Sequence, residues 1–355
     1  MKKDRKRGTL RRAAAWVLAA FALIILSAAL ILQAGKMRYK EELDNYYDIS
    51  TPLVRIPDID GGFIPQGICF DPSGMLIITG YMGNFSPSPI YVVDPSDGSF
   101  RKILMADPDG KPMRGHAGGA SILGETVFIA GSTGGCMYCF SLKDLLAAED
   151  GDTVKAFART ELKNGEDSIR VSFTGEDASL VYAGEFHRDP LFRTHPSHAT
   201  RTPYGTQKAY LFGYDPSDAL NAVPEKVYVI PDNVQGACFA DGYVFLSQSD
   251  GISSSLILAY SLDGLERAGT KKVMGKDIPM YILSPEGADR VTRVPPMAEE
   301  IYAEDGMMYI LYESASNRYR IGKRMGLDYV MGTPLTFFLP STTPSYSLSL
   351  RGGSL

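Results

Sequence analysis

Glu299 and Glu300 are the side chains whose type and placement most favour chemistry. The two acids follow Pro295-Pro296-Met297 and lead into an apolar run that is typical of a β-strand. A pair of carboxylates at a strand entrance can hold Ca²⁺ through oxygen ligands, or one of them can acquire a raised pKa for acid–base work. One buried ion pair beside one solvated acid is the structural alternative. We therefore regard Glu299 and Glu300 as candidate metal ligands, with Ca²⁺ as the candidate ion, and leave the cofactor otherwise unassigned.

A repeated motif surrounds two glutamines. Gln66-Gly67-Ile68-Cys69-Phe70 returns almost unchanged as Gln235-Gly236-Ala237-Cys238-Phe239, and each copy is followed by a turn and two apolar runs separated by a polar loop. Repetition at a period of tens of residues indicates units that bury their apolar faces against one another. The glutamines can bind a ligand, or they can satisfy backbone groups of a neighbouring unit. The adjacent glycines indicate that the units crowd together near an axis.

The pattern can be followed five times, with four short strands in each copy. Four strands per unit and radial closure predict an all-β protein, a β-propeller, with five blades and with six as the alternative. A strand at 53–57 precedes the first unit, and we expect it to pair with the last blade near 335–339 and lock the ring. First strands begin near residues 66, 118, 169, 235 and 299, and fourth strands are expected at 100–105, 154–160, 226–230, 281–283 and 335–339.

Antiparallel geometry gathers polar residues on one face of such a propeller. The start of each first strand and the end of each second strand lie at the same edge of a blade. The loops that follow the second strands therefore share a face with the entrances of the first strands, and loops on a rigid scaffold usually carry binding residues. The candidate ligand-binding residues of this funnel are Gln66, Tyr81, His116, Arg170, Glu185, Gln235, Ser249, Glu299, Glu300 and Glu313.

Three of the four histidines lie in one insertion, residues 186–207. A zinc site made of His187, His195 and His198 is conceivable, but their spacing fits no standard motif. Histidines that pack within the loop or face solvent are the alternative, which we favour. We expect the insertion to form a lid over the funnel.

The remaining nucleophiles and glycine motifs exclude several classes of enzyme. The single close cysteine pair, Cys136 and Cys139, has no second pair to complete a zinc site, and Cys69 and Cys238 occupy equivalent repeat positions. We expect four buried free thiols. There is no Gly-x-Ser-x-Gly elbow and no glycine loop leading into a helix, so serine hydrolase and nucleotide-dependent activities are not expected.

The N-terminal end predicts a membrane anchor. An apolar run long enough to cross a bilayer follows a basic segment, and its length favours an uncleaved anchor over a signal peptide. The first twelve residues carry a net charge of +6 and the whole chain −5, so the remainder carries −11. A basic end stays cytoplasmic, and an acidic exterior argues against nucleic acid as a partner. We expect a basic cytoplasmic tail at 1–12, a transmembrane signal anchor at 13–35, a stalk at 36–52, an extracytoplasmic propeller at 53–340 and a flexible C-terminal tail at 341–355.

The first unit resembles the opening blade of the five-bladed glutamine cyclotransferases. The resemblance is carried by Ile64-Pro65-Gln66-Gly67-Ile68, the loop Thr79 to Asn84 and Ile90-Tyr91-Val92-Val93-Asp94. It implies a central site that converts N-terminal glutamine to pyroglutamate. Gln66 and Gly67 match the family pattern. The family's carboxylate at the end of the second strand is absent, because Ile78-Thr79 stands there, and Glu313-Ser314 is its nearest equivalent. The chain also resembles bacterial extracytoplasmic propellers that act as binding or scaffold modules.

The sequence therefore leads to two functional hypotheses. The first is a membrane-anchored extracytoplasmic propeller that binds a ligand or a protein partner in or around its funnel. The second is a propeller enzyme that uses the funnel carboxylates, either as a glutaminyl cyclotransferase or as a Ca²⁺-dependent lactonase or esterase.

Overall fold

A computed structural model describes residues 2–132, 134–164, 167–216, 223–319 and 326–340. The chain divides into two compact units, Met1–Asp48 and Ile49–Leu355, which are described separately. The C-terminal tail expected at 341–355 lies outside the described residues.

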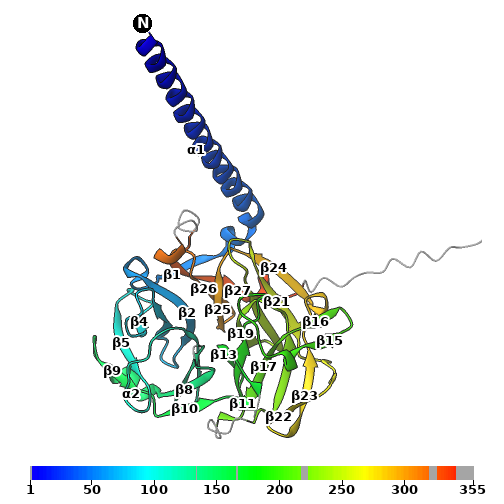
Figure 1. Ribbon diagram of the computed structural model, residues 1–355. Helices are drawn as coiled ribbons and strands as arrows, with labels where there is room; N and C mark the ends of the chain where they lie inside the picture. The colour runs from blue at the N-terminus through cyan, green and yellow to red at the C-terminus, as the bar shows by residue number, and fades with distance from the viewer. Residues whose placement is uncertain (1, 133, 165–166, 217–222, 320–325, 341–355) are drawn as a thin grey trace, which may run out of the picture. The chain divides into compact units, whose positions relative to one another are not determined.

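The first unit is formed by one helix, α1 (Lys2–Ile49), drawn as a continuous coil in Figure 1. Within it, Ala14–Ile31 has a mean hydropathy of 2.6, and α1 is the one helix of the described chain that is long and apolar enough to cross a membrane. This is compatible with a single-pass anchor, and a signal sequence would have the same character. The segment expected as a stalk continues the helix as far as Ile49, and Pro52 restricts the residue before it to extended conformations.

The second unit is a five-bladed β-propeller, as predicted. Blades 1 and 2 have the strand orders β2-β3-β4-β5-β9 and β10-β8-β7-β6. The expected fourth strand at 154–160 is divided between them, because β9 pairs in parallel with β5 whereas β10 completes blade 2. The elements are β2 (Phe63–Phe70), β3 (Leu76–Met82), β4 (Pro89–Val93), β5 (Phe100–Ala106), β6 (Ala117–Leu123), β7 (Thr126–Gly131), β8 (Cys136–Ser141), α2 (Leu142–Ala147), β9 (Thr153–Lys155) and β10 (Ala158–Glu161).

Blade 3 has the largest sheet, with the order β13-β14-β17-β18-β23-β22. Its last two strands are a hairpin from later in the chain, and β23 pairs in parallel with β18. The prediction that 281–283 completes blade 4 is therefore wrong, because this segment extends the edge of blade 3. The strands are β13 (Val171–Glu176), β14 (Val181–Glu185), β17 (Ala209–Tyr214), β18 (Lys226–Ile230), β22 (Gly269–Val273) and β23 (Lys276–Ile282), with small hairpins formed by β11 (Lys163–Asn164) and β12 (Asp167–Ser168) and by β15 (Thr200–Thr202) and β16 (Gly205–Gln207).

Blades 4 and 5 have the orders β19-β20-β21-β24 and β25-β26-β27-β1. The N-terminal strand thus closes the ring as expected, but its partner is β27, with Thr51 opposite Gly332 and Arg55 opposite Tyr329. Because β1 occupies the outer edge of blade 5, residues 335–339 form no fourth strand, and Leu335–Phe337 is a 3₁₀ turn. The strands are β19 (Val234–Ala240), β20 (Tyr243–Gln248), β21 (Ser255–Ser261), β24 (Arg290–Val294), β25 (Ala298–Glu304), β26 (Met307–Tyr312), β27 (Tyr329–Pro334) and β1 (Thr51–Arg55).

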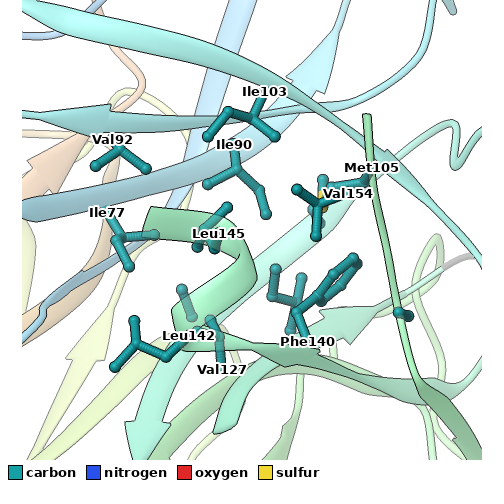
Figure 2. Packing of buried hydrophobic residues seen from close by; sticks show 14 of the residues in the cluster. Ile77, Ile90, Val92, Ile103, Met105, Val127, Phe140, Leu142, Leu145 and Val154 are labelled. Carbon is teal, nitrogen blue, oxygen red and sulfur yellow. The ribbon is translucent and has the colours of Figure 1, made fainter. Parts of the chain in front are cut away.

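The hydrophobic core lies between neighbouring blades. Successive side chains of a strand face opposite sides of its sheet, so Ile77 packs towards blade 2 while Ile78 packs towards blade 5. Figure 2 shows the layer between blades 1 and 2, where Leu142 and Leu145 of α2 lie among strand residues such as Ile77 and Ile90. Each blade is therefore stabilised only by its neighbours, which makes closure of the ring essential to every layer.

The five first strands contact one another around the axis, in the order β2, β6, β13, β19, β25 and back to β2. In Figure 1 the labels of β2, β13, β19 and β25 lie towards the middle of the propeller. Glycines permit this approach. A Cβ added to Gly119 would stand 2.7 Å from Glu300 Oε1, and one added to Gly236 would stand 2.6 Å from Glu300 Cα. The crowding expected from the repeated glycines is confirmed.

We predict that Gly119→Ala destabilises the propeller, because the new methyl group forces two first strands apart. Overpacking of this kind costs about 1–3 kcal/mol. Gly83→Ala is the matched control, since a Cβ there meets nothing nearer than 3.5 Å. The measurement is the free energy of unfolding of the full chain in detergent, and equal values for the two variants would contradict the crowding argument.

Candidate functional site

A bulge interrupts every first strand at the same level of the propeller. The pairing of first and second strands shifts register between Pro65 and Gly67 in blade 1 and between Val234 and Gly236 in blade 4, with equivalent shifts in the other three blades. A bulge leaves one residue unpaired and redirects its side chain. The residues released in this way include Gln66, Gln235 and Glu299, which all reach one cavity.

That cavity is the funnel at the mouth of the propeller, with a volume of about 500 Å³. Eight of the ten candidate residues line it, and the exceptions are Glu185 and Glu300. The predicted residues that line the funnel are Gln66, Tyr81, His116, Arg170, Gln235, Ser249, Glu299 and Glu313, and they are joined by Ser132, Ser172, Phe186, Arg188, Phe192, Gly251, Met297, Arg318 and Tyr319.

A chain of hydrogen bonds crosses the funnel floor. His116 Nδ1 lies 3.0 Å from Gln66 Oε1, and Gln66 Nε2 donates to Glu313 Oε2 at 3.2 Å. On the other side, Gln235 Nε2 donates to Glu299 Oε1 at 3.2 Å. Since an amide oxygen only accepts, the His116 ring must carry its proton on Nδ1. The chain thus links blades 2, 1, 5 and 4.

Glu299 and Glu313 form a carboxyl pair at the centre of this chain. Both are almost completely buried, and burial raises the pKa of Glu299 well above its usual range and that of Glu313 to about 7. The two side chains are hydrogen-bonded to each other, which requires a proton between them. Around neutral pH the pair therefore holds one proton and behaves as a single titrating unit.

Three arginines line the same cavity. Arg318 Nη1 donates to the Tyr81 hydroxyl at 2.6 Å, and the Tyr81 ring stacks on His116 with centroids 3.9 Å apart. Arg170 lies over the Phe192 ring, and Arg188 pairs with Asp250 at 3.0 Å. Burial, followed by the charges of Arg318 and Arg170, lowers the pKa of His116 to about 4. The imidazole is therefore neutral near pH 7.

Glu300 lies outside the funnel, among the first strands. Its Oε2 accepts the backbone N–H groups of Ile68 and Ala120 at 2.6 and 2.9 Å, from blades 1 and 2. Burial raises the pKa of Glu300 well above its usual range, and these donors oppose that shift. N–H groups occupy Oε2 of Glu300 while Glu299 bonds to Gln235, so the two neighbouring acids have different partners. In the described residues no group of three or more His, Cys, Asp or Glu side chains is arranged to hold a metal ion.

The Glu185 side chain bonds to residues of blade 3 and of the insertion at 186–207. It accepts from the Arg170 backbone N–H at 3.1 Å and lies 2.7 Å from His198 Nδ1, with both side chains buried. His187 contacts Thr194, and His195 is exposed. The rings of His195 and His198 also meet edge to face, with centroids 6.1 Å apart. All four cysteines are buried free thiols, as expected.

Arg318, Tyr319 and Phe192 line the funnel but were not predicted from the sequence. Each lies in a loop after a second strand, which is the rule that identified Tyr81 and Glu313. Arg318 and Tyr319 come only five and six residues after Glu313. Their position in loops after second strands could have identified them. In a long loop, however, the sequence does not show which side chain turns towards the axis.

Comparison with known proteins adds no family. No family model matches the chain, and neither does any curated protein. Among solved structures, similar chains include a glutaminyl cyclase of Myxococcus xanthus (TM-score 0.41, 10% identity, 80% of this chain and 92% of that one). A PQQ-bound aldose sugar dehydrogenase of Streptomyces coelicolor (TM-score 0.39, 15% identity, 80% and 96%) and BamB of Moraxella catarrhalis (TM-score 0.31, 10% identity, 80% and 99%) are also similar. Likeness at this level carries no argument about activity, and the propeller assignment depends on the order of the strands.

We predict that Glu300→Leu destabilises the propeller far more than Glu300→Gln. The leucine leaves the N–H groups of Ile68 and Ala120 without acceptors, at about 1–3 kcal/mol for each buried donor. The glutamine retains one acceptor oxygen. The measurement is chemical unfolding of the full chain, and equal losses for the two variants would show that these hydrogen bonds are dispensable.

We also predict a stability signature for the carboxyl pair. The pKa of Glu313 rises from an ordinary 4.5 to about 7 in the folded state, so the folded chain binds this proton more tightly than the unfolded chain does. Its stabilising effect is complete below pH 4.5 and is lost as the pH rises towards 7, at about 1.4 kcal/mol per pH unit for one proton.

Unfolding free energies between pH 4.5 and 7 should therefore fall more steeply for the wild type than for Glu313→Gln. The two proteins share the groups that face residue 313, which are Glu299, Gln66, Arg318 and Tyr319. They differ only in the side chain of residue 313 itself. Parallel profiles would mean that Glu313 titrates normally.

Proposed function

We propose that this protein is a membrane-anchored extracytoplasmic propeller that binds a small polar ligand in its funnel. The observation that carries the proposal is the convergence of side chains from all five blades on one cavity of about 500 Å³. A volume of this size suits a small molecule, and its mixture of aromatic walls and a few polar groups is typical of ligand pockets. The amides of Gln66 and Gln235 give the ligand oriented hydrogen-bonding partners beside the carboxyl pair.

The anchor and its orientation belong to the same proposal. The apolar segment Ala14–Ile31 follows a basic end, which favours a cytoplasmic N-terminus and a propeller outside.

A second candidate function is acid–base catalysis in the funnel. The feature that favours it is the buried carboxyl pair Glu299–Glu313 in the funnel, since a carboxyl group with a pKa raised to about 7 can both donate and accept a proton near neutral pH. Such a pair suits the cyclisation of an N-terminal glutamine, where one proton leaves the attacking amine and another reaches the departing ammonia. Hydrolysis of an ester or lactone needs the same transfers.

Both candidates are tested by one panel of compounds. The full chain in detergent is incubated with glutaminyl peptides, lactones, esters and small polar metabolites, and its thermal shift and any products are measured. We expect at least one compound to stabilise the protein, and Gln66→Ala to weaken its binding roughly tenfold or more, since Gln66 bonds to ionisable groups. Gln248→Ala is the matched control, because Gln248 donates to a backbone oxygen outside the funnel.

The outcome separates the candidates. Product formation that Glu313→Gln abolishes while binding persists would establish the enzyme, and binding without product would establish the binding module. Stabilisation that Gln66→Ala and Gln248→Ala alter equally would place the ligand elsewhere and refute both.

A further inference from the structure

We propose that the ligand carries a carboxylate, held by the guanidinium groups of Arg170 and Arg318. This inference rests on the proposed function of the funnel and names the chemical class that it selects. It depends on three features of the cavity, which are the ionic partners of its arginines, the state of its acids and its shape.

Arg170 faces the funnel without an acidic partner. Its guanidinium lies 5.7 Å from the centroid of the Phe192 ring. Its backbone N–H donates to Glu185 and its backbone carbonyl accepts from Ser172 Oγ, so these bonds do not involve the guanidinium. No carboxylate in the described part of the chain lies within ion-pair distance of this side chain. Stacking on an aromatic face leaves the edge of the guanidinium, with its N–H donors, available to a planar anion.

Arg318 approaches the same space from blade 5. It donates to the Tyr81 hydroxyl, and its guanidinium carbon lies 5.8 and 5.9 Å from the centroids of the Tyr81 and Tyr319 rings. Among the residues that the structure describes, it too has no carboxylate at ion-pair distance. Both arginine charges act on His116 and lower its pKa, which indicates that they border one volume.

Several other arginines of the propeller have acidic partners, although Arg114 and Arg267 bond only to backbone oxygens. Arg55 bonds to Asp60 and Asp328, and Arg193 bonds to Asp189. Even Arg188, at the funnel lip, is paired with Asp250. Arg170 is half-buried and Arg318 is exposed, and neither has an ion-pair partner among the described residues, although the charge of Glu313 acts on Arg318. In a chain of net charge −5, the two guanidinium groups form a local positive site.

The funnel acids do not neutralise this site. Glu299 and Glu313 share a proton and are hydrogen-bonded to each other and to the two glutamines, so the pair carries at most one negative charge beside two positive ones. That balance favours a monoanion and disfavours a phosphate dianion, which the carboxyl pair would repel. A flat carboxylate also matches the fork of a guanidinium and fits between the aromatic walls.

The test compares acetate with acetamide, which have the same shape and differ in charge. Saturation-transfer NMR follows the binding of each probe to the full chain in detergent at pH 7. We expect saturable binding of acetate only, weakened roughly tenfold or more in Arg170→Gln/Arg318→Gln, because hydrogen bonds between charged groups are lost. Arg193→Gln/Arg267→Gln removes the same net charge outside the funnel and should bind acetate as the wild type does.

Arg170→Gln alone provides a milder variant should the double substitution impair folding, and near-ultraviolet circular dichroism checks each protein. Acetate binding no better than acetamide binding overturns the inference, as does acetate binding that both double variants weaken equally. If both probes bind, both are lost in Gln66→Ala and neither responds to the arginine substitutions, the funnel binds ligands without selecting an anion. That result refutes the carboxylate and leaves the proposed function standing.

Discussion

One buried carboxylate at the propeller axis makes the close approach of the five first strands possible. The first strands form the inner edges of their sheets, so N–H groups on this side have no ladder partner where the strands crowd together. Glu300, from the last blade, accepts two such donors from the first and second blades. An unsatisfied buried donor costs about as much as a lost hydrogen bond, so a single side chain compensates for strain that closure itself creates.

The candidate funnel follows from the bulges in the first strands. These bulges redirect Gln66, Gln235 and Glu299 towards the mouth. At the mouth, Glu313 bonds to Gln66 and Glu299 bonds to Gln235. These hydrogen bonds hold the four side chains in place and leave the cavity open. The adjacent acids therefore have different surroundings. Glu299 lines the cavity, whereas Glu300 bonds to the first strands of neighbouring blades.

The repeat rhythm allowed the fold to be predicted because strand periodicity and turn residues are local signals. It located the five first strands and most of the funnel residues, since antiparallel pairing fixes which strand ends share a face. The outer edges were harder. Residues 276–282 joined blade 3, and residues 335–337 formed a 3₁₀ turn. An outermost strand pairs with whichever neighbouring sheet has an unpaired edge. That depends on the folded arrangement, and no local sequence pattern predicts it.

The sequence by itself determined the blade type, the number of blades, the apolar N-terminal segment and the set of residues that could meet at the axis. Tertiary structure alone decided which of them do meet. Glu185 is covered by the insertion through His198, whereas Arg318 enters the funnel from a loop. The physical reason is that burial, shared protons and unpaired charges arise between segments far apart in the chain, so they exist only after the ring has closed.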